Sequence, residues 1–110
     1  FMRMIIYIIK LAERNRKPLT VKLFTIERAD GSELVGTDID EASDFLRAII
    51  VSSIRSTDIT TPYSRTKRMV LFFNADSENS VQAIEPINEK CAELDVEKKY
   101  AITSEEISLS

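Results

Sequence analysis

The sequence predicts an α+β fold with one antiparallel sheet, and three observations lead to it. Its 110 residues, 44% hydrophobic and 30% charged, suit a single globular domain with one core. Apolar residues recur at helical spacing in some segments and cluster as β-formers in others. These segments follow one another as α-β-α-β-β-α-β. The last six elements match the ferredoxin-like β-α-β-β-α-β arrangement, an architecture that many unrelated proteins share.

The first element is a predicted leading helix over residues 2–15, with an apolar stripe of Met4, Ile5, Ile6, Ile8, Ile9, Leu11 and Ala12. We expect the stripe to cover one face of the sheet or, in part, to pair with a second copy or an upstream helix. A strand over residues 19–28 follows, because Val21, Leu23, Phe24 and Ile26 favour a central strand. Asp30, Gly31 and Ser32 then turn the chain.

The second helix has the strongest pattern. Asp38 or Asp40 is its expected N-cap, and one face carries Ala42, Phe45, Leu46, Ile49, Ile50 and Ile54. Strands over residues 58–63 and 68–74, joined by a tight polar turn, come next. Asp76 or Ser77 caps a third helix whose inward side chains are Val81, Ile84, Ile87, Cys91 and Leu94. Pro86 lies on the solvent side of this helix and either kinks it or marks its first turn. A last strand covers residues 99–103, and residues 105–110 are a candidate extension.

The residue inventory excludes several kinds of chemistry. The chain has no histidine, which rules out histidine triads and histidine metal ligands. Its two glycines are too few for a phosphate-binding loop. A net charge of −3 argues against nucleic acid as a partner. An RNA-recognition domain would need exposed aromatics in a basic field, and Phe24, Phe72 and Phe73 lack that motif's glycines and basic flank. We read the single Cys91 as a buried apolar residue, and no segment is long enough to cross a membrane.

One region resembles a known family. The helix that ends in Arg55-Ser56-Thr57-Asp58, the hairpin through residues 63–68 and the strand over residues 69–73 resemble the GGDEF (diguanylate cyclase) family. In element order the resemblance covers nearly the whole chain. It implies a cytoplasmic domain of bacterial signal transduction, either free or as the cytoplasmic part of a membrane-anchored protein. It also implies neighbouring sensor or effector domains in a longer chain, of which residues 1–110 form one degenerate GGDEF-like domain.

The catalytic features of the family are missing. At the positions of the G-G-D-E-F motif stand Ser64, Arg65, Thr66, Lys67 and Arg68, or the five residues one place later. The end of the first strand has only Glu27 as an acidic residue. The family condenses two GTP molecules with divalent cations held by carboxylates. We therefore expect no enzyme activity, no catalytic or metal-binding residues and no cofactor. Arg65, Lys67 and Arg68 are candidates for direct phosphate contacts, although a solvated basic turn also accounts for them.

Arg55 and Asp58 match the family's inhibitory site, which holds cyclic-di-GMP. An arginine can pair with a guanine edge or a phosphate, and an aspartate accepts hydrogen bonds from guanine. The simpler alternative is that Arg55 interacts with the helix dipole and Asp58 starts a turn.

Three hypotheses follow. The first is an inactive GGDEF-like module that acts by dimerisation or interdomain contact, with no membrane contact of its own. The second is a cyclic-di-GMP receptor that uses Arg55 and Asp58. The third is a residual GTP-binding or cyclase enzyme.

Overall fold

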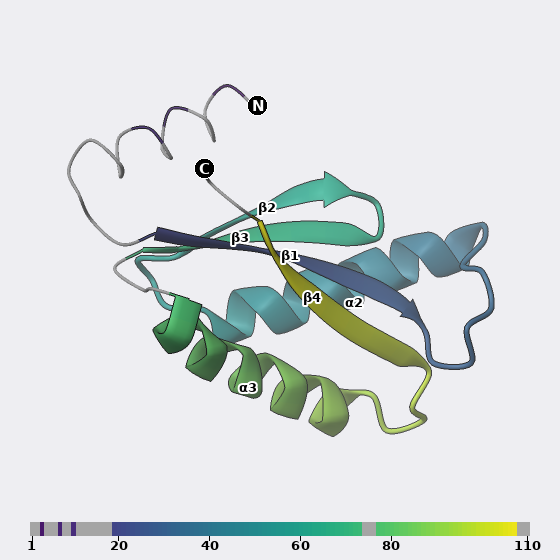
Figure 1. The fold of residues 1–110 in the computed structure, drawn as a ribbon. Coiled ribbons are helices and arrows are strands. Elements are labelled where there is room, and N and C mark those ends of the chain that lie inside the picture. Colours follow the sequence, from purple (N-terminus) through teal and green to yellow (C-terminus); the bar gives the residue numbers. More distant parts are fainter. Residues whose placement is uncertain (1–2, 4–6, 8–9, 11–18, 74–76, 108–110) are drawn as a thin grey trace.

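An antiparallel four-stranded sheet with the order β2-β3-β1-β4 forms the centre of the fold. The computed structural model describes residues 3, 7, 10, 19–73 and 77–107, and over residues 77–83 it describes the backbone alone. The elements in these ranges are β1 (Leu19–Arg28), α2 (Thr37–Ser53), β2 (Ile59–Ser64), β3 (Lys67–Phe73), α3 (Ser77–Leu94) and β4 (Tyr100–Ile107) (Figure 1). This confirms the predicted order from the first strand onwards. Apart from Arg3, Tyr7 and Lys10, the helix expected over residues 2–15 lies outside the described residues.

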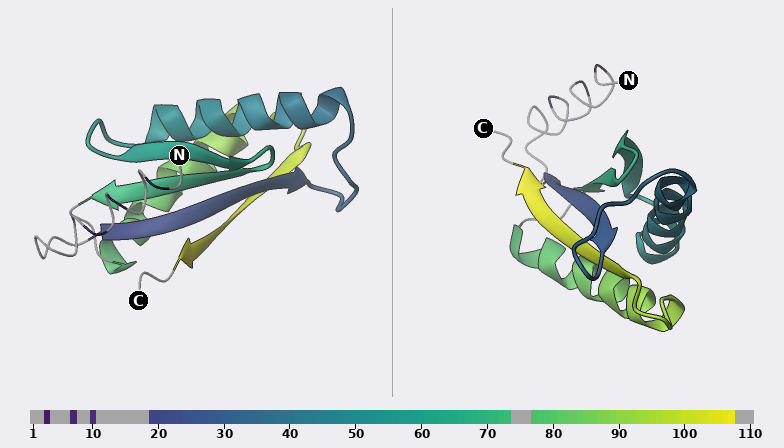
Figure 2. Two further views of the ribbon diagram at one scale, coloured as in Figure 1. Left: turned by 90° about the horizontal axis from the view of Figure 1, so that it is seen from above. Right: turned by 90° about the vertical axis from the view of Figure 1, so that its right-hand side faces the viewer.

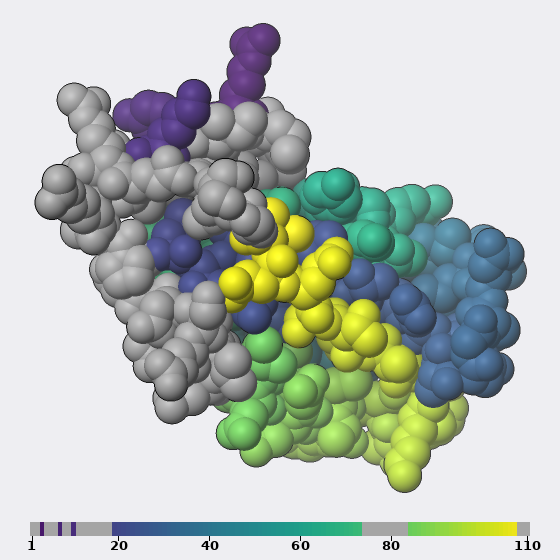
Figure 3. Space-filling view, viewed as in Figure 1, coloured from purple at the N-terminus to yellow at the C-terminus, as the bar shows by residue number. Residues whose placement is uncertain are grey.

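Strand β1 is central and pairs with two strands that are distant in sequence. Its register runs from Leu19↔Phe73 to Thr25↔Lys67 with β3, and from Val21↔Ile107 to Arg28↔Tyr100 with β4. The last strand is therefore longer than its 99–103 core, as the candidate extension suggested. In the space-filling view β4 lies at the surface in front of β1 (Figure 3). At the opposite edge, β2 contains Pro62 and an irregularity between Pro62 and Ser64.

Helices α2 and α3 cover the same face of the sheet (Figure 2). The main core lies between these layers and consists of Phe24, Ile26, Ala42, Leu46, Ile49, Ile50, Val70, Phe72 and Ile87. Phe24 and Phe72 are thus core residues rather than the exposed aromatics that an RNA-binding sheet needs. Side chains alternate along a strand, so Val21, Leu23, Met69 and Leu71 form a second buried cluster on the other side of the sheet.

The start of α2 differs from the prediction. The N-cap is Gly36, at a φ of 59°, and no side chain caps the helix. Asp38 and Asp40 lie in the first turn, where acidic residues favour the helix dipole. Each is held by an arginine from the sheet side of the molecule, because Arg28 pairs with Asp38 and Arg65 pairs with Asp40. The predicted caps were wrong because the helix begins at Thr37, which places both aspartates inside its first turn.

Helix α3 is continuous through Pro86, so this proline does not mark a first turn. The proline is exposed, as predicted, and Ile87 on the next position is fully buried. The prediction that Leu94 points inward was wrong, since it is the last residue of the helix and is 49% exposed. Asp95 follows and accepts hydrogen bonds from the backbone N–H groups of Lys99 and Tyr100, both at 2.9 Å. Asp76 and the side chains of Ser77 and Val81 lie outside the description.

The turn after β1 forms where Asp30, Gly31 and Ser32 predicted it. Asp30 Oδ1 accepts hydrogen bonds from the Ser32 backbone N–H at 2.9 Å and from its hydroxyl at 2.6 Å. These bonds lower the pKa of the Asp30 carboxyl, and Gly31 supplies a φ of 82°. No helix in the described ranges has the length and apolar character to span a bilayer.

Candidate functional site

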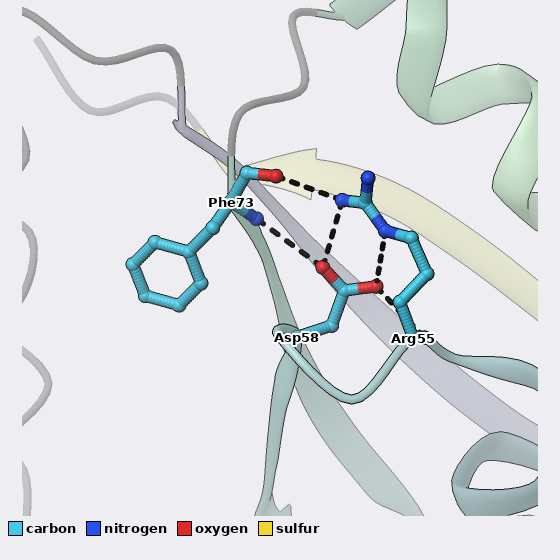
Figure 4. A network of polar contacts seen from close by, with 3 residues as sticks. All are labelled: Arg55, Asp58 and Phe73. Carbon is cyan, nitrogen blue, oxygen red and sulfur yellow. Dashed lines mark hydrogen bonds and ion pairs between the residues drawn. The ribbon is translucent and has the colours of Figure 1, made fainter.

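The two residues of the predicted ligand site bind each other where α2 leads into β2. Arg55 directs its Nε and Nη2 to the two carboxylate oxygens of Asp58, at 3.0 and 2.9 Å (Figure 4). The same carboxylate accepts the Arg55 backbone N–H at 3.0 Å and the Phe73 backbone N–H at 3.4 Å. Arg55 Nη2 also donates to the Phe73 carbonyl at 2.7 Å. The network fastens the end of α2 to the end of β3.

The side chains of Arg55 and Asp58 differ in their exposure to solvent. The Asp58 side chain is 1% exposed, whereas that of Arg55 is 56% exposed. A carboxylate has about four lone-pair positions, and four donors reach the one on Asp58. The hydrogen bonds and negative charge of Asp58 raise the pKa of the Arg55 guanidinium above its usual value. Asp58 is therefore a buried anchor, and Arg55 is the member of the pair that solvent or a ligand can reach.

The three candidate phosphate-binding residues diverge. The hairpin turn consists of Arg65 and Thr66, between the paired residues Ser64 and Lys67. The Arg65 guanidinium donates a hydrogen bond to the Asp40 carboxylate on α2. Lys67 and Arg68 are consecutive in β3, so their side chains leave on opposite faces of the sheet. Arg68 lies on the helix side, where its Nε donates to Thr60 Oγ1 at 2.9 Å. The structure does not bring these three cations to one point.

A shallow pocket of about 360 Å³ lies beside the hairpin turn. The end of β1, the loop over residues 31–34 and Thr66 line it, and its charged side chains are Glu27 and Glu33. The Ile26 backbone N–H donates to the Thr66 carbonyl at 2.9 Å, which holds the turn against β1. Within the described ranges, no three acidic, cysteine or histidine side chains come together as a metal site.

A larger cleft of about 510 Å³ was missed by sequence reasoning. It lies between the end of β1, the start of α2 and the start of β4, where Arg28, Lys98, Lys99 and Tyr100 contribute to its wall. The Tyr100 ring meets Phe45 at 5.1 Å between centroids. Burial first, then the charge of Glu41, raises the pKa of the Tyr100 hydroxyl. The residues that line this cleft come from segments far apart in the chain, so no local sequence motif predicts the cleft.

The chain has a GGDEF-like fold, as comparison with solved structures shows. No model of a known protein family matches the chain, and no curated protein matches it. Among solved structures, a DGC protein from Thermotoga maritima superposes with a TM-score of 0.74 at 15% identity, over 99% of this chain and 79% of that one. The active GGEEF domain of a diguanylate cyclase from Vibrio cholerae gives 0.67 at 18% identity, over 88% of this chain and 65% of that one. At such identities the likeness establishes the fold.

Proposed function

We propose that this chain is a GGDEF-like regulatory module without cyclase activity, which passes a signal by dimerisation or by contact with a neighbouring domain in the cytoplasm. The observation that carries the proposal is the hairpin. Its positions hold Ser64, Arg65, Thr66, Lys67 and Arg68 where the family has glycines and carboxylates. Two of these side chains are engaged in the fold itself, through Asp40 and Thr60.

Electrostatics support the same proposal. Catalysis in this family depends on divalent cations that neutralise the developing negative charge on phosphate. With the motif at residues 64–68, Thr66 and Lys67 replace its acidic pair, and one place later Lys67 and Arg68 do. In either register a cation stands where a carboxylate should be, and it repels divalent metal ions instead of binding them. The adjoining pocket has acidic side chains only at Glu27 and Glu33, and it lies beside a turn whose backbone is already bonded to β1.

A pyrophosphate-release assay with GTP tests the inactive state. We expect no turnover with Mg²⁺ or Mn²⁺, while the same preparation shows a cooperative unfolding transition that proves it is folded. Light scattering across a concentration series then measures dimerisation. Pyrophosphate release that depends on enzyme concentration would overturn the proposal.

Arg55 favours a second candidate function, the binding of cyclic-di-GMP. Its guanidinium is held in a fixed orientation by Asp58 and by the Phe73 carbonyl, yet more than half of the side chain is exposed. A pre-oriented cation loses little conformational freedom when it binds a phosphate or a guanine edge. Asp58 enters this hypothesis in a different role from the one predicted, as the group that orients Arg55.

Calorimetric titration with cyclic-di-GMP distinguishes the candidates. If Arg55 is the contact, Arg55→Ala abolishes binding, and a cooperative urea unfolding transition checks that the variant is still folded. The matched control is Lys99→Ala, because Lys99 is also a half-exposed cation with one carboxylate partner, Glu97 at 3.2 Å. Binding that is equal in both variants, or absent in the wild type, would remove the receptor hypothesis and leave the regulatory module.

A further inference from the structure

The cleft of about 510 Å³ at Tyr100 has no part in the functions proposed above. The end of β1, the start of α2 and the start of β4, which line it, lie together at one end of the molecule (Figure 1). Arg55 follows the other end of α2, about 25 Å away at helical rise. The volume of the cleft suits a small molecule. The cleft is therefore a candidate site of its own, separate from the hairpin and from Arg55.

Positive and negative charges balance in the lining of this cleft. It contains three cations and three carboxylates, which belong to Arg28, Lys98, Lys99, Asp30, Asp38 and Glu41. Four of the six already have partners in the fold, in the pairs Arg28–Asp38, Lys99–Glu97 and Asp30–Ser32. Lys98 and Glu41 remain, and no described residue of opposite charge lies within ion-pair distance of either. The cleft thus presents one available cation and one available carboxylate, from two different elements.

Lys98 has a strained backbone at the edge of the cleft. Its φ is 54°, and no other non-glycine residue in the described ranges has a positive φ. The buried Asp95 fixes this loop, because its carbonyl accepts the Lys98 N–H at 3.0 Å and its carboxylate accepts the next two backbone N–H groups. Glycine or asparagine adopts this conformation more easily than lysine does. A lysine held in this way at the wall of a cleft indicates that its ammonium group is used there.

A second hollow of about 280 Å³ adjoins the cleft and adds apolar surface. Glu41 and Tyr100 line both spaces. The apolar side chains of the second hollow are Phe45, Leu94, Val96 and Tyr100. Leu94 and Val96 are 49% and 83% exposed, so apolar surface is open to water beside the two charges. Surface of this kind next to a few polar groups is typical of a site for a partly apolar small molecule.

We propose that this cleft binds an amino acid with a large apolar side chain. Lys98 pairs with the carboxylate of the ligand, and Glu41 pairs with its ammonium group, both through charge-assisted hydrogen bonds. The side chain of the ligand covers the rings of Phe45 and Tyr100. A ligand with a single charge would satisfy one of the two groups and leave the other without a partner. The proposal adds a small-molecule signal to the regulatory module, and it does not depend on the absence of cyclase activity.

The test is an NMR titration of the full chain with L-phenylalanine and with L-leucine at pH 7, followed on the backbone amide signals of residues 98–100. We expect a saturable shift with both amino acids. Two analogues of phenylalanine separate the charges, since 3-phenylpropionate lacks the ammonium group and phenethylamine lacks the carboxylate. Each should bind about tenfold more weakly, as expected for the loss of one charge-assisted contact. No saturable shift with either amino acid, or equal affinity for an analogue, would overturn the proposal.

Substitutions assign the two contacts. Lys98→Gly removes the cation and also relieves the backbone strain, so it should weaken phenylalanine binding about tenfold without lowering the urea midpoint. Such a loss of affinity cannot come from unfolding. Glu41→Gln should have a similar effect on affinity. Its matched control is Glu89→Gln, on the exposed side of α3, which should leave binding unchanged. Affinity that neither Lys98→Gly nor Glu41→Gln alters would refute the assigned site.

Discussion

Replacement of Asp58 by alanine tests whether this carboxylate anchors the fold. The variant leaves the backbone N–H groups of Arg55 and Phe73 without their acceptor and removes the partner of the Arg55 guanidinium. An unpaired buried donor costs about 1–3 kcal/mol. The bond to Phe73 is long at 3.4 Å, and the guanidinium is half-exposed and regains water, so each of these contributes little. We expect a loss of about 2–4 kcal/mol in the free energy of unfolding.

Urea unfolding followed by circular dichroism measures this loss. With an m-value of about 1–3 kcal/mol per molar, the midpoint falls by about 0.7–4 M and the slope stays the same. The matched control is Glu97→Ala, since the Glu97 carboxylate is 73% exposed and pairs only with Lys99. Surface pairs of this kind contribute about 0–1 kcal/mol. Equal effects of the two substitutions would refute the assignment of Asp58 as a buried anchor.

Three further predictions concern other parts of the molecule. Pro86 lies inside α3 on its exposed side, so Pro86→Ala should raise the urea midpoint by restoring a backbone donor, a gain of up to about 3 kcal/mol. The pKa of Tyr100 is raised in the folded state, so its contribution to stability is fully present below the unfolded pKa of about 10 and is lost as pH rises through the folded pKa. Ultraviolet titration should show a late-ionising tyrosine that disappears in Tyr100→Phe, and an unchanged curve would contradict the burial of this ring. Burial, and secondarily the charge of Asp95, raises the pKa of the Cys91 thiol. Iodoacetamide should therefore modify this thiol more slowly at pH 8 in the folded protein than after unfolding in urea. Equal rates would show an accessible thiolate.

Most of the fold from residue 19 onwards could be predicted from periodicity. The strand over residues 19–28 and the apolar face of α2 were predictable from their periodicity. Every second side chain of a strand, and every third or fourth of a helix, lies on the same face. Element ends were less predictable. Asp38 and Asp40 are residues of a type that is common at N-caps, but the helix begins earlier, after Gly36, and both aspartates lie in its first turn. There they pair with arginines that are distant in sequence. The exposure of Leu94 depends on where α3 ends relative to the sheet, which no local pattern encodes.

The candidate site was predictable only where its residues are close in sequence. Arg55 and Asp58 are three residues apart and do meet, but their mutual pairing and the role of Phe73 depend on how β3 lies against the end of α2. Lys67 and Arg68 were predicted to contact phosphate together because they are adjacent in sequence. In a strand, however, consecutive side chains lie on opposite faces of the sheet. The cleft at Tyr100 is lined by separate elements and has no signal in a linear motif.

The position of β1 at the centre of the sheet determines the order in which the domain can be completed during synthesis. Its residue Val21 pairs with Leu71 on one side and with Ile107 on the other, so the strand made early waits for the last one to leave the ribosome. Until then the apolar side chains of β1 lack one of their two flanking strands. Long-range pairing of this kind slows folding and leaves a nascent chain open to aggregation. A ribosome that pauses before β4 has emerged would therefore hold the sheet with one side of β1 unpaired.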